Sequence, residues 1–300
     1  MGFYESLCKK YSYESRVEPA GTIHPPLEEP QHLNPGGTIL PNHNWGSIQG
    51  YKGRHLFQSI LDVALFGSAI RVPEWKELHR LVTSTNKCNF KIFFCGHARP
   101  NFDLPDNLIY IYSDMTPAAC VEIAYRHAMS SNSDYIMNIT DDCTWTPGML
   151  DSLIEEFKSH EKQSSSELVV GPSYINSRGR RPMDLHLVQN DHSTPQALVF
   201  SMMKRITAYR TGGLDKRFEG VNWDLDRYLR LHALEEDIKF KVCDDLVISE
   251  SPGGTLSSRC VRSDREILDS LWSWWPCIRS EPVQYYTNDD LIFTLDYNKQ

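Results

Sequence analysis

The chain has 300 residues, of which 40% are hydrophobic and 23% are charged, as is usual for globular proteins. This composition excludes an intrinsically disordered chain, which would carry fewer apolar residues. The formal net charge of −8 argues against a surface that coats nucleic-acid phosphates, because such binding needs clustered Lys and Arg.

The cysteines and the N-terminal residues bear on the cellular compartment. No apolar run approaches the ~20 residues of a membrane-spanning helix. Residues 1–16 lack the apolar core of a signal peptide. The 8 cysteines form no CxxC pair, and several lie inside apolar runs, as buried thiols in a reducing compartment do. We therefore expect a cytoplasmic protein without a transmembrane segment.

Proline and glycine divide the chain into three expected parts. Residues 17–53 contain EPAGTIHPPLEEPQHLNPGG, a stretch that neither a long helix nor a central strand tolerates. We expect residues 1–53 to form an N-terminal arm on the surface of the domain. Residues 54–256 are expected to form the main domain, and residues 257–300 a helical C-terminal extension packed on it.

From residue 54 onwards, short apolar strands alternate with amphipathic helices. The predicted strands are Ser59–Phe66, Phe90–Cys95, Asn107–Tyr112, Asp134–Thr140 and Leu168–Gly171. The predicted helices are Pro73–Ser84, Pro117–Met129 and Pro147–His160. This order predicts an α/β domain with a largely parallel sheet flanked by helices. Because such sheets bind ligands at the carboxyl ends of their strands, we expect function in the loops after residues 66, 95, 112 and 140.

Two adjacent acids, Asp141 and Asp142, follow the fourth predicted strand in the segment TDDCTWTPGML. Carboxylates at this edge of a sheet suit Mg²⁺ or Mn²⁺ held together with a substrate diphosphate. The alternative is a pair of capping acids for the helix that begins at Pro147. Neither acid directly precedes that helix, so we favour the ligand-binding interpretation.

A second polar segment, TGGLDKRFEGVNWDLDRYLR, covers residues 211–230. Asp224 lies at the predicted start of a helix, where a carboxylate either caps backbone N–H groups or faces a substrate hydroxyl as a base. Asp226 and Arg230 have the four-residue spacing of an ordinary ion pair on a helix surface. Taken alone, this segment favours a structural role.

The order of the two segments resembles that of the GT-A nucleotide-sugar glycosyltransferases, and family 2-like members in particular. Those proteins show D-x-D followed by Pro-Gly-x-Leu, then GGfDe-F, then ED-x-D-x-x-x-R. This chain has TDDCTWTPGML, GGLDKRF and WDLDRYLR in the same order, and the resemblance covers about residues 57–256. It implies a GT-A, Rossmann-like fold. It also implies an enzyme that moves a hexosyl or pentosyl group, with inversion, from a nucleotide-sugar to a hydroxyl acceptor such as a glycan.

The resemblance further implies roles for single residues. Asp224 matches the general base, and Asp142 matches the metal-binding acid of D-x-D. Glu250 is the nearest ligand type to a late histidine of the family, so Asp142 and Glu250 are the expected ligands of Mn²⁺ or Mg²⁺. The residues expected to bind the donor nucleotide are Leu65, Phe66, Gly67, Gly96, His97 and Asp141. The residues expected to bind the acceptor are Gly212, Gly213, Trp223 and Asp226.

Two departures from the family pattern keep other functions open. Thr140 replaces the first acid of D-x-D, and Trp223 replaces the Glu of the ED motif, where it offers an apolar face to a sugar. One alternative is a transferase of the same fold acting on modified nucleic-acid bases, which the basic segment Arg178–Arg181 favours and the net charge opposes. The other is a non-enzymatic carbohydrate-binding descendant. The tryptophans at 272, 274 and 275 suit either core packing or sugar stacking.

Overall fold

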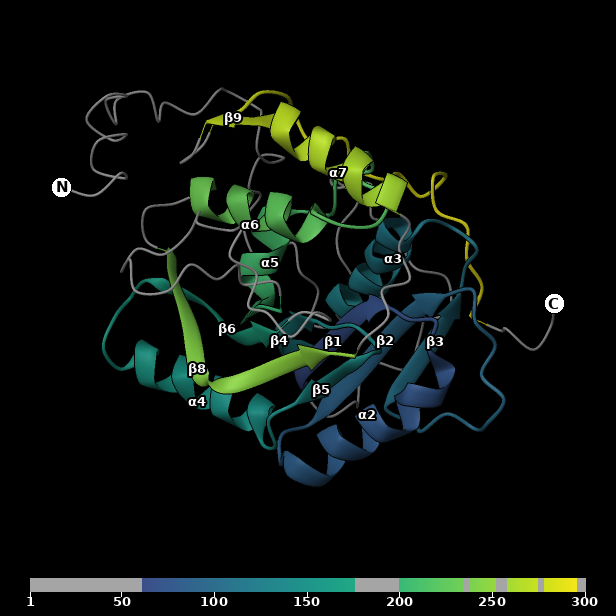
Figure 1. Cartoon of the computed structure of the whole chain (residues 1–300). Helices are drawn as coiled ribbons and strands as arrows, with labels where there is room; N and C mark the ends of the chain where they lie inside the picture. The colour runs from purple at the N-terminus through teal and green to yellow at the C-terminus, as the bar shows by residue number, and fades with distance from the viewer. Residues whose placement is uncertain (1–60, 176–199, 235–237, 252–257, 275–277, 296–300) are drawn as a thin grey trace.

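The computed structural model describes residues 61–175, 200–234, 238–251, 258–274 and 278–295 (Figure 1). The predicted N-terminal arm and the basic segment Arg178–Arg181 lie outside these ranges. Within them, one eight-stranded sheet has the order β3-β2-β1-β4-β7-β6-β8-β5 and carries helices on both faces. The fold is therefore α/β and Rossmann-like, as the sequence predicts.

The first half of the sheet is parallel. Its strands are β1 Leu61–Ser68, β2 Phe90–Gly96, β3 Leu108–Tyr112 and β4 Ser133–Asn138. β1 lies in the centre of this half, parallel to β2 and β4, and β2 is parallel to β3. The strands are almost continuously apolar because helices cover both faces of a parallel sheet. The helices α2 Val72–Thr85, α3 Pro117–Ser130 and α4 Met149–Glu161 also agree with the prediction to within two residues at each end.

The second half of the sheet mixes strand directions, whereas the sequence predicts a largely parallel sheet. Its strands are β5 Cys143–Trp145, β6 Glu167–Ile175, β7 Met202–Lys204 and β8 Ile238–Glu250. β7 is antiparallel to both β4 and β6, β8 is parallel to β6, and β5 is antiparallel to β8. The prediction lacks β5, β7 and β8. Strands of three residues carry too little periodicity to be predicted. β8 begins with the alternation IKFKV, which is a strand signal that the prediction does not use.

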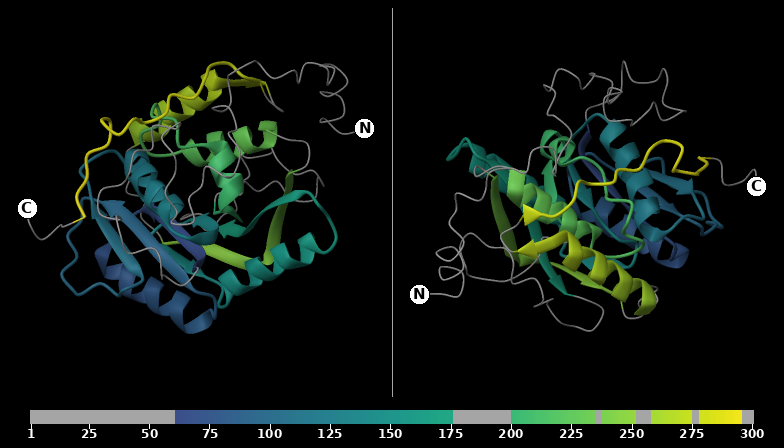
Figure 2. Two further views of the ribbon diagram at one scale, coloured as in Figure 1. Left: turned by 180° about the vertical axis from the view of Figure 1, so that it is seen from behind. Right: turned by 90° about the horizontal axis from the view of Figure 1, so that it is seen from above.

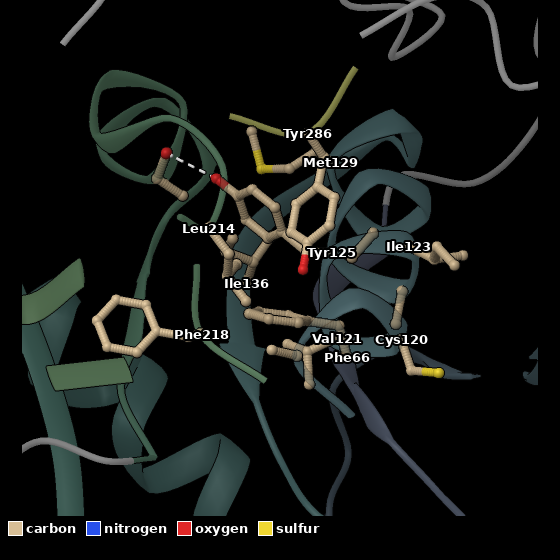
Figure 3. Packing of buried hydrophobic residues seen from close by; sticks show 14 of the residues in the cluster. Phe66, Cys120, Val121, Ile123, Tyr125, Met129, Ile136, Leu214, Phe218 and Tyr286 are labelled. Carbon is tan, nitrogen blue, oxygen red and sulfur yellow. Dashed lines mark hydrogen bonds between the residues drawn. The ribbon is translucent and has the colours of Figure 1, made fainter. Parts of the chain in front are cut away.

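Two apolar cores lie on the two faces of the sheet. One core packs α2 and α4 against the sheet, and the other packs α3, α5 Arg205–Thr211 and α6 Trp223–Leu234 (Figure 1). Phe66 of β1 lies against Tyr125 of α3 with ring centroids 5.2 Å apart, and the Tyr125 hydroxyl donates to the Ala208 carbonyl at 2.7 Å (Figure 3). None of the helices in the described ranges is both long and apolar enough to span a bilayer.

The described residues from Ser258 onwards run along the side of the sheet that carries α3 and α6 (Figure 2), and they contribute to the core there. They form α7 Ser258–Leu271, the short hairpin β9 Trp272–Trp274 and β10 Ile278–Arg279, and a segment that reaches the edge strand β3 through a bridge between Tyr112 and Thr294. α7 lies outside α6 and contributes Leu268 and Leu271 to the core.

Buried charges connect the C-terminal residues to α6. The Asp226 carboxylate accepts hydrogen bonds from Arg230 Nε at 3.0 Å, Arg279 Nε at 3.0 Å and Trp272 Nε1 at 2.8 Å. Arg279 also pairs with Asp215, and all four charged residues are fully buried. The spacing of Asp226 and Arg230 predicts a surface ion pair, and this prediction is wrong, because the C-terminal residues cover that face of α6.

Candidate functional site

A cleft of about 650 Å³ opens at the carboxyl ends of the parallel strands. The loops after β1, β2, β3 and β4 all contribute to its walls. These are the loops in which the sequence predicts functional residues. The opposite wall consists of residues 220–224 and of Glu250 and Ser251 at the end of β8. The cleft thus brings the two polar segments of the sequence together across 82 residues, from Asp142 to Asp224.

Asp141 holds two of the loops together. Its Oδ2 atom accepts hydrogen bonds from the backbone N–H of Ile70 at 2.6 Å, the backbone N–H of Arg71 at 2.5 Å and the indole N–H of Trp75 at 2.7 Å. Burial raises the pKa of Asp141 to about 6, while these donors act in the opposite direction. The loop after β1 is therefore fixed to the end of β4 beside the cleft.

Asp142 faces the cleft beside an arginine. Its Oδ2 atom lies 3.2 Å from Arg71 Nη2, and both side chains are mostly buried. Its backbone carbonyl accepts the Ser251 N–H at 2.8 Å, which joins the end of β8 to this loop. Arg71 directly precedes α2 and also lies 3.6 Å from Glu74. The fixed backbone of Arg71 and the Asp142 carboxylate together direct its guanidinium to the cleft wall.

Asp224 reaches the cleft from the first turn of α6. Asn222, just before the helix, has a φ of 62°, a left-handed conformation that asparagine tolerates better than most residues. The carbonyl of Asn222 accepts the Asp226 N–H at 2.9 Å, so the helix begins here. Trp223 and Asp224 follow directly and both line the cleft.

The loop before Asp224 is anchored from α7. The fully buried Asp264 carboxylate accepts the backbone N–H groups of Glu219 at 2.9 Å, Gly220 at 2.7 Å and Val221 at 2.7 Å. The Glu219 carbonyl in turn accepts the Ala118 N–H at the start of α3. The C-terminal residues therefore fix the backbone that places Asp224.

The acids of the cleft influence one another. Burial raises the pKa of Asp224 to about 6, and the negative charge of Glu250 adds to this rise, against two backbone N–H donors. The pKa of Tyr174, which also lines the cleft, is raised by burial and by its hydrogen bond to Glu250. Asp224 thus combines a place in the cleft lining with a raised pKa.

The residues predicted to hold a divalent cation do not fit one. Asp142 is paired with Arg71, and Glu250 is hydrogen-bonded to Tyr174. The described ranges hold no group of three or more His, Cys, Asp or Glu side chains placed to bind a metal ion. A cation on Asp142 would lie beside the guanidinium, and such like charges repel by several kcal/mol near a protein surface.

The other predicted donor residues divide into two groups. Gly96 and the exposed His97 line the cleft, whereas the Leu65 and Phe66 side chains are fully buried in the two cores. Gly67 is not part of the lining either, although Ser68 beside it is. A Cβ atom on Gly96 would lie 2.2 Å from the Ala69 carbonyl oxygen, so glycine permits the loops after β1 and β2 to approach this closely.

Three of the predicted acceptor residues lie away from the cleft lining. Gly212 has a φ of 72°, and a Cβ atom there would lie 2.8 Å from the Tyr285 hydroxyl. The Gly213 carbonyl accepts from Arg230 Nη2 at 2.9 Å. Together with the buried Asp226, this glycine turn packs against the C-terminal residues. Of the four predicted acceptor residues, Trp223 lines the cleft.

Sequence reasoning missed Arg71, Asn222, Tyr174 and Asp264. The position of Arg71 could have indicated a functional residue, because it follows the first strand in a loop where ligands are expected. Asn222 had a weaker signal, as an Asn just before a predicted helix. Tyr174 belongs to a strand that is predicted to end at residue 171. Asp264 acts on a loop 43–45 residues earlier in the chain, and no local pattern predicts such a contact.

The sheet and its cleft define an α/β protein of Rossmann-like topology with a cleft at the carboxyl ends of its parallel strands. No protein-family model and no curated protein sequence matches the chain. Among solved structures it is similar to TarS 1-349 of S. aureus in complex with UDP, with a TM-score of 0.45 and 10% identity over 72% of this chain and 73% of that one. For the structure of TarS 1-349 of S. aureus, the TM-score is 0.46 and the identity is 9%, over 72% of this chain and 73% of that one. For the structure of S. aureus TarS, the TM-score is 0.44 and the identity is 10%, over 70% of this chain and 40% of that one.

Proposed function

We propose that the chain is a nucleotide-sugar glycosyltransferase that transfers a sugar to a hydroxyl acceptor with inversion. The observation that carries this proposal is the position of Asp224. A carboxylate whose pKa is raised to about 6 lies across one cleft from the strand-end loops of a parallel sheet. Strand-end loops bind nucleotides in folds of this kind, and a base near neutrality accepts a proton efficiently.

The proposed reaction uses the two walls of the cleft for different tasks. Asp224 accepts the proton of the acceptor hydroxyl while the acceptor oxygen attacks C1 of the sugar. The bond between C1 and the diphosphate oxygen breaks, and its electron pair stays on the leaving diphosphate. Attack from the face opposite to the leaving group inverts the configuration at C1, which suits a base that approaches from the opposite wall.

Further residues are proposed to position the two substrates. Trp223 offers an apolar surface to the acceptor, and sugar rings stack on such surfaces. Gly96 and His97 are proposed to contact the nucleotide at the strand ends. Asp141 is proposed to act indirectly, because its hydrogen bonds hold the loop of Ile70 and Arg71.

The first test is a panel of UDP-, GDP-, CMP- and dTDP-sugars on the full chain. A donor at 100 times its Kd should stabilise the protein by ~2.7 kcal/mol, which a thermal shift detects. Release of the free nucleotide is then followed with water as the acceptor. Stabilisation by a donor without any release, either with water or with sugar hydroxyls as the acceptor, would favour a binding protein over an enzyme.

The second test is Asp224→Asn, which keeps size and helix-capping ability. Loss of a general base should lower the release rate by about 10²–10⁴-fold. Glu219→Gln is the matched control, since this exposed acid precedes the same helix without lining the cleft, and it should keep the wild-type rate. An equal rate in Asp224→Asn and wild type would refute the assignment of the base.

A further inference from the structure

Arg71 is a positively charged residue of the cleft wall that the strand-end loops form, and none of the predicted roles includes it. It is about one-sixth exposed, lines the cleft together with Gly96, Asp142 and Asp224, and precedes α2 without capping it through its side chain. Its backbone N–H is held by Asp141, and its guanidinium by Asp142. A long cationic side chain is therefore fixed from both ends at the edge where a donor diphosphate is expected.

The chemistry of a guanidinium suits this position. Its planar fork presents five N–H donors, so one face can bind a carboxylate while another binds phosphate oxygens. Hydrogen bonds between a guanidinium and phosphate are charge-assisted and often bidentate. Asp142, which the sequence predicts as a metal ligand, is paired with this guanidinium in the structure.

We propose, building on the proposed glycosyltransferase function, that Arg71 takes the place of the divalent cation. Its guanidinium binds the donor diphosphate, and Asp142 holds the guanidinium in position. When the C1–oxygen bond breaks, the electron pair moves onto the diphosphate oxygen, and Arg71 stabilises the charge that develops there. Donor binding and turnover then need no added metal ion.

The test is isothermal titration of the full chain with UDP, GDP, CDP and dTDP in EDTA, repeated with Mn²⁺. The proposal predicts that one of these nucleotides binds in EDTA and that Mn²⁺ changes its Kd by less than about threefold. Binding that appears only with Mn²⁺ would overturn the role of Arg71 and leave the transferase proposal standing. Absence of binding to all four under both conditions would overturn both.

Variants separate phosphate binding from a merely structural role. Arg71→Gln should raise the Kd of the nucleoside diphosphate by about 10- to 100-fold, as expected for the loss of a charge-assisted contact. The Kd of the matching nucleoside should stay unchanged. Arg71→Lys should restore part of the loss. Arg80→Gln, which removes an exposed guanidinium of the same helix, should have no effect. Equal weakening of nucleoside and diphosphate by Arg71→Gln would contradict the proposal.

Asp142→Asn provides an independent discrimination. In a metal-dependent site this variant would be more damaging to diphosphate binding than Arg71→Gln. With Arg71 as the binding group, Asp142→Asn should have the smaller effect of the two. It removes the carboxylate that positions the Arg71 guanidinium and leaves the guanidinium itself in place. The reverse order would argue against the proposal.

Discussion

The two walls of the cleft are positioned by different means. The strand ends of β1 to β4, which form the wall with Asp142, are held by apolar strands and crossover helices. The wall with Asp224 lies at the start of α6, which also packs in an apolar core, and buried charges on Asp215, Asp226, Asp264 and Arg279 connect this region to the C-terminal residues. Apolar packing tolerates small changes, whereas a buried charge depends on every partner. The Asp224 wall should therefore be the more fragile of the two.

The largest expected effect on stability is that of Asp226→Asn. This change leaves Arg230 and Arg279 buried beside a neutral amide. Breaking a buried ion pair in this way costs about 3–5 kcal/mol. Urea denaturation of the full chain should show that loss in the free energy of unfolding.

A surface pair with the same spacing serves as the control. Arg265 and Asp269 form an i,i+4 pair at 3.0 Å, and both side chains are more than half exposed. Asp269→Asn should cost only about 0.3–0.5 kcal/mol. Similar losses in the two variants would show that the C-terminal residues do not shield Asp226 in solution.

Asp264→Asn should have an intermediate effect on stability and a separate effect on rate. An amide cannot accept from all three N–H groups as the carboxylate does, and poorly satisfied buried N–H groups cost about 1–3 kcal/mol. Because the loop leads to Asp224, the release rate should fall while the Kd of the nucleoside diphosphate stays constant. An unchanged rate in the folded variant would exclude a positioning role for Asp264.

The release rate should also depend on pH. Asp224 must be deprotonated to accept a proton, and its pKa is raised to about 6. The release rate should therefore be constant above pH ~7 and fall about tenfold for each pH unit below ~6. A pH–rate profile measures this directly. If Asp224→Asn shows the same fall in rate below pH ~6, the titrating group is another residue.

The same contrast explains what the sequence predicts. The parallel half follows from local signals, namely apolar runs, prolines in first turns and short crossovers, and its elements match to within two residues. The acids at 141, 142 and 224 follow from their places at element ends. The burial of Asp226 and the anchor Asp264 depend on partners 43–53 residues away, which spacing does not reveal. The sequence predicts Asp142 as a metal ligand and gives no sign that Arg71 pairs with it.

One paired measurement shows whether one wall of the cleft binds the donor while the other supplies the base. The Kd of the bound nucleoside diphosphate and the release rate are determined for wild type, Arg71→Gln and Asp224→Asn under identical metal-free conditions. We expect a crossed pattern, in which Arg71→Gln weakens binding about 10- to 100-fold and Asp224→Asn keeps the wild-type Kd but loses about 10²–10⁴ in rate. Loss of binding in Asp224→Asn, or wild-type binding in Arg71→Gln, would contradict it.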